Sequence, residues 1–355
     1  MSGITLIPAN EGDTSFVNSR IMRITTVPTK GSILITTINS PTAAVKKIAT
    51  DRPDWTFIVI GDTKTPSNWA WPGVSYLSIA DQIAQVGKFA EKCPERHYAR
   101  KNIGYLKAIA DHSPVVAETD DDNIPYDSFL GDVNRELTAR PVLKKGWENV
   151  YTHFTKDRIW PRGFPLELIN ESLKHPSSLG EPALYDCPIQ QFLADGDPDV
   201  DAVYRLTIEA LTKFEPNRVV LEPGTYCPFN SQNTIFWPET FPLLYLPAYV
   251  SFRMTDIWRS FIAQRCLYAM GKPLAFREAT VLQERNEHSL IRDFKDELPG
   301  YLNNPRIIEI LEGLSLSSAP AKCAQNLGAC YEALISAEIV PSQEMELVTL
   351  WIDSF

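Results

Sequence analysis

Three consecutive aspartates, Asp120, Asp121 and Asp122, follow a short apolar segment, with Glu118 two positions before them. Two unit charges roughly 4 Å apart repel by about 1 kcal/mol in water and about 4 kcal/mol at an effective dielectric constant of 20. The cluster therefore needs either full solvation or a bound cation. A solvated acidic turn is one interpretation. A divalent-metal site with oxygen ligands, of the kind that carries substrate phosphates, is the other, and Asn123 as a further oxygen donor favours it.

A second group of acids lies later in the chain. Asp256 is at the expected start of a helix, where an acid that complements the helix dipole is frequent. Arg253 and Arg259 flank it, and we expect them to hold its carboxylate ionised unless burial raises its pKa. Asp199 and Asp201 are competing catalytic acids, although their Asp-Pro-Asp-Val-Asp segment also fits an ordinary turn.

The chain before the triple aspartate alternates between strand-like and helical patterns. Continuous β-branched and apolar runs predict strands at 32–37, 55–60, 74–77 and 114–117, separated by helices over 43–49, from about 79 and over about 95–111. This alternation predicts βαβ units and a mostly parallel sheet. Ligands bind at the carboxyl ends of strands in such sheets, and the aspartates directly follow the last of these strands. Their position favours a binding site.

The second half of the chain is less regular. From about 140 to 246 it is rich in proline and aromatic residues, which predicts strands joined by long functional loops. A helix is expected from Thr255, and the tail from Pro305 onward is expected to be mainly helical.

Composition excludes several classes of protein. The 355 residues are 44% hydrophobic and 22% charged, as in globular proteins, and 44 acidic against 34 basic side chains give a net charge of −10. No broad basic surface for nucleic acid or anionic lipid is expected, so a few local cations or a metal must hold any anionic ligand. Six scattered cysteines without a CxxC pair argue against structural zinc. Without an apolar signal or membrane span, the sequence predicts a soluble, reduced, cytoplasmic protein.

Seven segments occur in one order along the chain: YARKNIGYL (98–106), ETDDDN (118–123), NVYTHF (149–154), IWPRGFP (159–165), GDPDVDAVYRL (196–206), VSFRMTDIWRS (250–260) and RNEH (285–288). Together they resemble the STELLO family of glycosyltransferase-like proteins. The plant members are Golgi membrane proteins, and because no membrane anchor is expected here, that location is not carried over. More distantly, the triple aspartate and the Asp-Ile-Trp segment are similar to the reversibly glycosylated polypeptides, which include nucleotide-sugar mutases.

Both resemblances imply a glycosyltransferase A-type fold. This is an α/β, Rossmann-like architecture with a mixed, mostly parallel sheet flanked by helices, here followed by a helical C-terminal extension. We expect an N-terminal extension over 1–30 and a catalytic domain over 31–300. Its nucleotide-binding half would cover about 31–130 and its acceptor half about 131–300, and a helical segment would occupy 301–355.

The resemblance also implies that the triple aspartate is the DxD element. Asp120 and Asp122 would bind the metal, and Asp120 and Asp121 would contact the nucleotide. A diphosphate leaves poorly unless its charge is neutralised, and a metal held by few carboxylates keeps positions open for phosphate oxygens. A histidine late in the chain commonly completes the metal shell in this fold, which makes His288 the candidate and favours Mn²⁺ over Mg²⁺.

Four further residues are expected to bind the nucleotide sugar. Arg100 and Lys101 would meet the diphosphate, the first as a bidentate fork and the second as a point charge. A solvated helix surface is the alternative for this pair. Asp62 and Thr37 follow strands of the same predicted sheet and would border the nucleobase and ribose, although polar residues at strand ends are often only turn formers.

The leading hypothesis is a metal-dependent glycosyltransferase. It would move a sugar from a UDP- or GDP-sugar to a hydroxyl of a carbohydrate or glycoconjugate acceptor, and Asp256 as general base would make the reaction inverting. Trp160, Arg162 and Phe164 would shape the sugar or acceptor pocket, with loop packing as the alternative. A nucleotide-sugar mutase and a non-catalytic scaffold are the other hypotheses, and the intact acids count against the scaffold.

Overall fold

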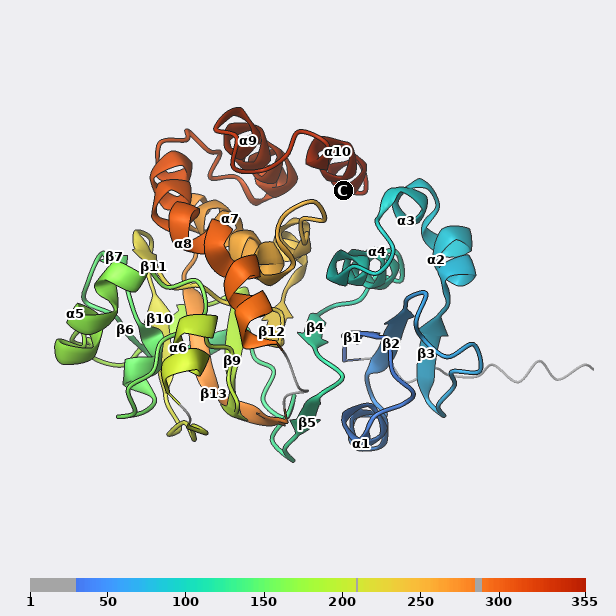
Figure 1. Cartoon of the computed structure of the whole chain (residues 1–355), viewed down its shortest axis with the longest axis horizontal. Coiled ribbons are helices and arrows are strands. Elements are labelled where there is room, and N and C mark those ends of the chain that lie inside the picture. The colour runs from blue at the N-terminus through green and yellow to red at the C-terminus, as the bar shows by residue number, and fades with distance from the viewer. Residues whose placement is uncertain (1–29, 209, 285–288) are drawn as a thin grey trace, which may run out of the picture.

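A long mixed β-sheet runs through the molecule, and helices cover both of its faces (Figure 1). The computed structural model describes residues 30–208, 210–284 and 289–355. Within these ranges the sheet has eleven strands: β1 (Ser32–Thr37), β2 (Thr56–Gly61), β3 (Val74–Leu77), β4 (Val116–Thr119), β5 (Asn123–Pro125), β6 (Glu136–Pro141), β8 (Ala183–Asp186), β9 (Ile189–Gly196), β10 (Arg218–Leu221), β12 (Asn233–Phe236) and β13 (Leu274–Gln283). Their order is β3-β2-β1-β4-β12-β9-β13-β10-β6-β8, and β5 pairs with β13. A small second sheet joins β7 (Gly146–Trp147) and β11 (Thr225–Tyr226).

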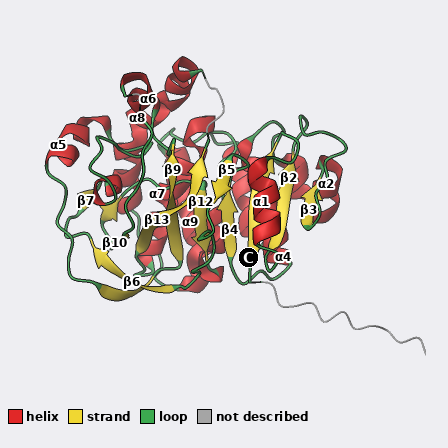
Figure 2. Ribbon diagram, turned by 90° about the horizontal axis from the view of Figure 1, so that it is seen from below, coloured by secondary structure: helices red, strands yellow, loops and turns green. Residues whose placement is uncertain are grey.

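The N-terminal half of the sheet is the regular half. Strands β3, β2, β1 and β4 are all parallel, and they match the strands predicted from sequence with shifts of at most two residues. The helices between them are α1 (Ala43–Asp51), α2 (Ile79–Val86), α3 (Lys88–Lys92) and α4 (Lys101–Ala110). Helices α1 and α4 cover opposite faces of the strands, which explains why β1, β2 and β4 are buried along almost their whole length (Figures 1 and 2). Gly104 lets α4 approach closely, since a Cβ there would lie 3.0 Å from Ile60 and 3.1 Å from Leu34.

The C-terminal half of the sheet mixes strand directions. Strand β12 is antiparallel to both β4 and β9, whereas β13 is parallel to β9 and antiparallel to β10. The short helices α5 (Ile169–Lys174) and α6 (Ala202–Thr207) lie in the connections of this half, and α7 (Thr255–Ala269) begins at the predicted residue. The predicted α/β class, with a mixed sheet flanked by helices and a helical C-terminal part, is confirmed.

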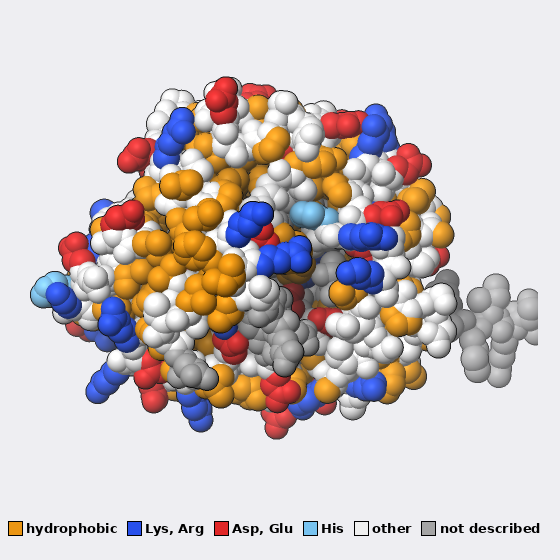
Figure 3. Space-filling view, in the orientation of Figure 1, with side chains coloured by type: hydrophobic (Ala, Val, Ile, Leu, Met, Phe, Trp, Pro, Cys, Tyr) orange, Lys and Arg blue, Asp and Glu red, His pale blue; other side chains and the backbone are white. Residues whose placement is uncertain are grey.

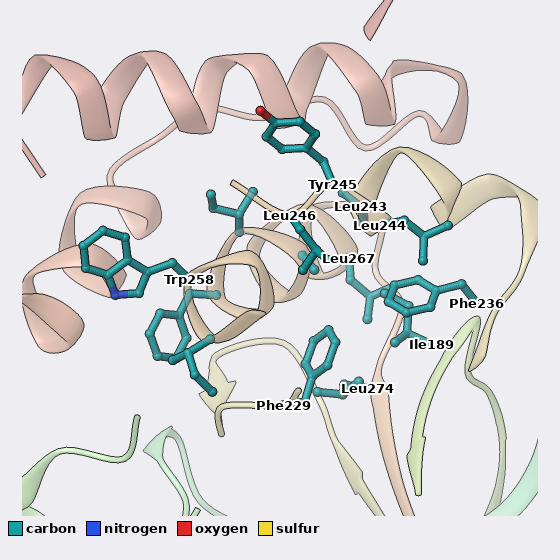
Figure 4. Packing of buried hydrophobic residues seen from close by; sticks show 14 of the residues in the cluster. Ile189, Phe229, Phe236, Leu243, Leu244, Tyr245, Leu246, Trp258, Leu267 and Leu274 are labelled. Carbon is teal, nitrogen blue, oxygen red and sulfur yellow. The ribbon is translucent and has the colours of Figure 1, made fainter. Parts of the chain in front are cut away.

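The C-terminal helices pack onto the main core. They are α8 (Leu290–Glu312), α9 (Cys323–Ser336) and α10 (Glu344–Ile352). Tyr245 is fully buried, with its ring centroid 5.3 Å from that of Tyr331 in α9 and 5.5 Å from that of Trp351 in α10. Figure 4 shows how α7 packs in this core: Leu267 lies among Ile189, Phe236 and Leu274 of the sheet and the 243–246 segment. The division into domains at 30 and 300 stays a prediction, and α8 runs through the second of these positions.

Across the described ranges, none of the helices combines the length and the apolar character that crossing a membrane requires.

Candidate functional site

A pocket of about 380 Å³ opens where β1, β2 and β4 end. It corresponds to the hollow near the centre of the face in Figure 3, where basic side chains lie on either side and acidic ones are visible between them. Its lining combines the ends of these strands with residues before α4, residues around the start of α7, Arg162 from a loop and Gln283 from the end of β13. The full set is Thr36, Thr37, Ile38, Asn39, Ile60, Gly61, Asp62, Lys64, Arg96, His97, Tyr98, Arg100, Asp120, Asp121, Asp122, Arg162, Phe252, Arg253, Asp256 and Gln283. The strand-end rule thus brings the acids into a cavity, as the sequence predicted.

Asp120 is the aspartate of the cluster that pairs with a buried lysine. The Lys101 ammonium lies 3.0 Å from its Oδ1, and the Tyr98 hydroxyl donates to the same oxygen at 2.7 Å. Lys101 has 0% exposure and also donates to the backbone carbonyls of Thr119 at 2.8 Å and Ser231 at 3.1 Å. A solvated helix surface therefore does not describe Lys101, which neutralises the first aspartate from beneath the pocket.

Asp121 and Asp122 carry the remaining charge. Thr37 Oγ1 donates to Asp121 Oδ2, and Asn39 Nδ2 donates to the same oxygen at 3.1 Å. Burial raises the pKa of Asp121 despite these bonds. Burial, followed by repulsion from the two preceding aspartates, raises the pKa of Asp122 to about 7. Asp122 is thus the carboxylate of the cluster that a nearby cation would relieve most.

The carboxylates fit a divalent cation that substrate would help to bind. Asp120 and Asp122 line the same pocket, and hard divalent cations are often held by one or two carboxylates together with phosphate oxygens. Among the residues that the structure describes, no cluster of three or more His, Cys, Asp and Glu side chains is placed to hold a metal alone. The third predicted ligand, His288, lies outside the described residues.

Asp256 lines the same pocket and is held by Arg162. The guanidinium donates through Nη1 to Asp256 Oδ1 at 3.0 Å and through Nη2 to Oδ2 at 2.9 Å. It also forms a second fork to Asp199, with Nε donating at 2.7 Å and Nη2 at 2.9 Å. Burial would raise the pKa of Asp199, but the charge of Arg162 outweighs this and lowers it. The amide and hydroxyl of Ser231 lie 3.4 Å from Asp256 Oδ2.

The two arginines expected to hold Asp256 bind other carboxylates. Arg253 pairs with Glu297 at 2.8 Å, and Arg259 pairs with Glu118 at 2.7 Å. The predicted pairing followed from adjacency in sequence, whereas side chains along a helical turn point in different directions. Arg162, which was expected to shape the sugar or acceptor pocket, makes this contact across 94 positions of chain.

Thr37 and Asp62 both line the pocket, as predicted, but the Asp62 carboxylate is occupied. It accepts the backbone N–H of Thr63 at 2.7 Å, of Arg96 at 2.9 Å and of His97 at 3.1 Å. Asp62 therefore fixes the turn that carries Arg96 and His97 at the pocket wall. A contact between Asp62 and a ribose or base stays a prediction.

Other predicted residues are buried in structural contacts. The three guanidinium nitrogens of Arg100 donate to Gln82 Oε1 and to the carbonyl of Cys93, although Arg100 is also among the residues that line the pocket. Trp160 donates to Asp201 at 2.7 Å, and Phe164 packs edge-on against Trp147. Asp201 also accepts the amide of Tyr204 as the N-cap of α6. Neither aromatic residue is among the lining residues, so loop packing describes these two better than pocket shaping.

Sequence reasoning did not single out Lys64, Arg96, Phe252 or Gln283, which all line the pocket. Phe252 is 53% exposed at the wall and stacks edge-on against Tyr98. Lys64 and Arg96 add positive charge to the lining of the pocket. The position of Lys64 just after β2 was a usable signal, whereas Arg96 reaches the wall only through the turn that Asp62 fixes.

Comparison with known proteins supports the resemblance seen in the motifs. Residues 253–355 match a family model described as STELLO glycosyltransferases. Probable glycosyltransferase STELLO2 of Arabidopsis thaliana is 28% identical over 333 residues, which covers 88% of this chain and 43% of that protein. Probable glycosyltransferase STELLO1 of the same plant is 30% identical over 300 residues, which covers 79% of this chain and 38% of that protein. The chain therefore spans less than half the length of these relatives. Its predicted resemblance to the STELLO family is confirmed.

A solved mycobacterial protein aligns with 77% of this chain and 74% of its own, at 11% identity and a TM-score of 0.40.

Proposed function

We propose that this relative of the STELLO glycosyltransferases is a metal-dependent glycosyltransferase that moves a sugar from a UDP- or GDP-sugar to a hydroxyl acceptor. One observation carries the proposal. A single pocket at the carboxyl ends of the parallel strands is lined both by the triple aspartate and by Asp256, which a buried arginine orients.

The triple aspartate suits a diphosphate that binds together with a cation. Asp120 and Asp122 would hold Mn²⁺ or Mg²⁺, which when bound would neutralise charge on the departing diphosphate. Lys64 and Arg96 line the same cavity and add positive charge beside it. Thr37 borders the end of the pocket where the nucleoside would lie, as is usual at the strand ends of such sheets.

Asp256 is placed to accept a proton from the acceptor hydroxyl. A carboxylate has about four lone-pair positions. Arg162 takes one on each oxygen and Ser231 approaches Oδ2 at 3.4 Å, so Oδ1 keeps a position for the acceptor hydroxyl. The two-pronged contact fixes the plane of the carboxylate, which orients the base before the acceptor arrives. Direct attack by the deprotonated hydroxyl on the anomeric carbon would invert its configuration.

The test is donor turnover by the purified chain. We expect release of UDP or GDP from at least one nucleotide sugar in the presence of Mn²⁺ and an acceptor, and none with chelator. Asp256→Asn should lower transfer by about 10²–10⁴-fold without abolishing nucleotide binding. Asp111→Asn, which removes an exposed acid paired with Lys107, is the matched control and should act like the wild type.

The outcomes separate the competing functions. If the chain neither binds nor turns over any UDP- or GDP-sugar with Mn²⁺ present, the proposal is contradicted. Conversion of the sugar within the nucleotide sugar, without release of the diphosphate, would instead indicate a mutase. Retained configuration in the transferred sugar would refute the role of Asp256 as base of an inverting reaction.

A further inference from the structure

A smaller pocket of about 110 Å³ continues the main one inward. The two share six residues: Asp120, Asp122, Arg162, Arg253, Asp256 and Gln283. The inner pocket adds Asp199, Asn230 and Gln232. It therefore begins between the acid cluster and Asp256, where the group attached to a metal-bound diphosphate would lie under the proposed function.

The inner pocket is rich in carboxylates and amides. Its lining contains four carboxylates, three amide side chains and two guanidinium groups. Carboxylates accept hydrogen bonds from hydroxyls, and amides both donate and accept them. Asn230 Nδ2 donates to Asp199 at 2.9 Å, and the Gln232 amide donates to Gln283 Oε1, so the wall is a connected polar network. Such a wall matches a ligand with many hydroxyl groups.

Both guanidinium groups of the inner pocket are already paired. Arg162 is 5% exposed and makes two-pronged contacts with Asp199 and with Asp256. Arg253 donates through Nε and Nη2 to Glu297, which has 0% exposure. A carboxylate brought in by a ligand would therefore compete with buried acids for each arginine, and like charges placed together at an interface are strongly disfavoured.

We infer that the transferred group is an uncharged, hydroxyl-rich sugar bound in the inner pocket, and that this pocket rejects uronic acids. The inference rests on the proposed function and adds the class of donor to it. Its sharpest test uses donor pairs that differ only at C6, where a hydroxymethyl group replaces a carboxylate.

Binding of these pairs to the full chain can be measured by calorimetry with Mn²⁺. The pairs are UDP-glucose and UDP-glucuronate, UDP-galactose and UDP-galacturonate, and GDP-mannose and GDP-mannuronate, with UDP and GDP alone as references. For the nucleotide that binds, we expect the neutral sugar to bind at least about 30-fold more tightly than its uronate partner. Equal affinity within a pair, or tighter binding of the uronate, would overturn the inference.

A variant tests whether charge in the inner pocket is the cause. Asp199→Asn removes one carboxylate and frees part of Arg162, so the neutral-to-uronate affinity ratio should fall by about tenfold. Asp201→Asn makes the same chemical change at a buried acid outside the inner pocket and should keep the wild-type ratio. An unchanged ratio in Asp199→Asn would count against the inference, and if that variant does not fold, the wild-type pairs still decide it.

The references separate the two levels of the proposal. If neither UDP nor GDP binds with Mn²⁺, the proposed function fails and the inference fails with it. If the nucleotide binds but the uronate is preferred, the nucleotide site stands and only the assignment of a neutral sugar is wrong.

Discussion

Two buried arginines near the start of α7 bind carboxylates in opposite settings. Arg259 is 1% exposed and donates to both oxygens of Glu118, at 2.9 and 2.7 Å, while its guanidinium lies over the rings of Phe229 and Phe236. Neither partner of this pair lines the pockets described above. Arg162 binds Asp256 in nearly the same two-pronged way, but this pair lines both pockets.

The comparison shows that an ion pair alone does not identify a site. Asp256 and Arg259 are three positions apart on α7, about one helical turn, yet one faces a cavity and the other the core. Around Glu118, the hydroxyl of Tyr105 and Arg259 occupy the oxygens from within the protein. Asp256 lines a cavity, and among the described residues its Oδ1 accepts only from Arg162, so chemistry is possible there.

The largest effect is expected from breaking the buried Arg259–Glu118 pair. Arg259→Met leaves the Glu118 charge buried without its partner, which should lower the free energy of unfolding by about 3–5 kcal/mol. Chemical denaturation measures this directly. Glu118→Gln is the companion variant and should also destabilise, because Arg259 then loses its counter-charge. A loss below about 1 kcal/mol in Arg259→Met would show that the pair does not secure the core.

A smaller effect, on turnover instead of stability, is expected at the Arg162–Asp256 pair that lines the pocket. Arg162→Lys keeps the charge but loses the fork, so Asp256 should be less well oriented and transfer should slow by about 100-fold. We expect kcat to fall while the affinity for UDP or GDP with Mn²⁺ changes little. Arg259→Lys is the matched control and should change stability more than turnover per folded molecule. Loss of nucleotide affinity in Arg162→Lys would contradict a role confined to orienting Asp256.

The strands of the regular half of the sheet and their parallel direction could be predicted from sequence, because strands buried on both faces show as continuous apolar runs. Their order in the sheet was not predicted. The strand-end rule also brought Thr37, Asp62 and the aspartates to one cavity. The partners of Asp256 could not be predicted, since Arg162 reaches it through loops of the irregular half. The burial of Lys101 could not be predicted either, because the sequence of a helix does not show that a charged side chain on it pairs with a distant aspartate, here Asp120.

Asp199 and Asp201 extend the comparison to two neighbouring buried acids. Asp199 is bound by the guanidinium of Arg162, whereas Asp201 accepts hydrogen bonds from the neutral donors Trp160 and the Tyr204 amide. Burial raises the pKa of Asp201 to about 7, above its ordinary 3.8. The native state then keeps a proton that the unfolded chain releases, so stability falls as pH rises from about 4 to 7 and levels off above that. Between pH 5 and 8 this should amount to about 2–3 kcal/mol.

Asp201→Asn should remove this contribution. The difference in unfolding free energy between wild type and variant, measured by denaturation at several pH values, should therefore shift in favour of the variant as pH rises from 5 to 8. A difference that is the same at every pH would mean that Asp201 is already ionised in the folded protein at pH 5.

The smallest effect is expected at the rim of the open site. Arg96→Gln removes a cation that lines the pocket and should weaken UDP or GDP binding by about three- to tenfold, less at high salt. Arg140→Gln removes an exposed arginine that donates to the carbonyls of Gly180 and Leu179 and should leave nucleotide affinity unchanged. Equal weakening in both variants would indicate a general charge effect rather than a local contact.

The most direct measurement is a crystal structure with Mn²⁺ and UDP or GDP, with the metal located by anomalous scattering. We expect the metal peak between the carboxylates of Asp120 and Asp122, bridging them to the diphosphate, and a nucleoside that extends toward Thr37. Well-ordered crystals in which the nucleotide and metal lie elsewhere, while these carboxylates contact only water, would contradict the assignment of this pocket.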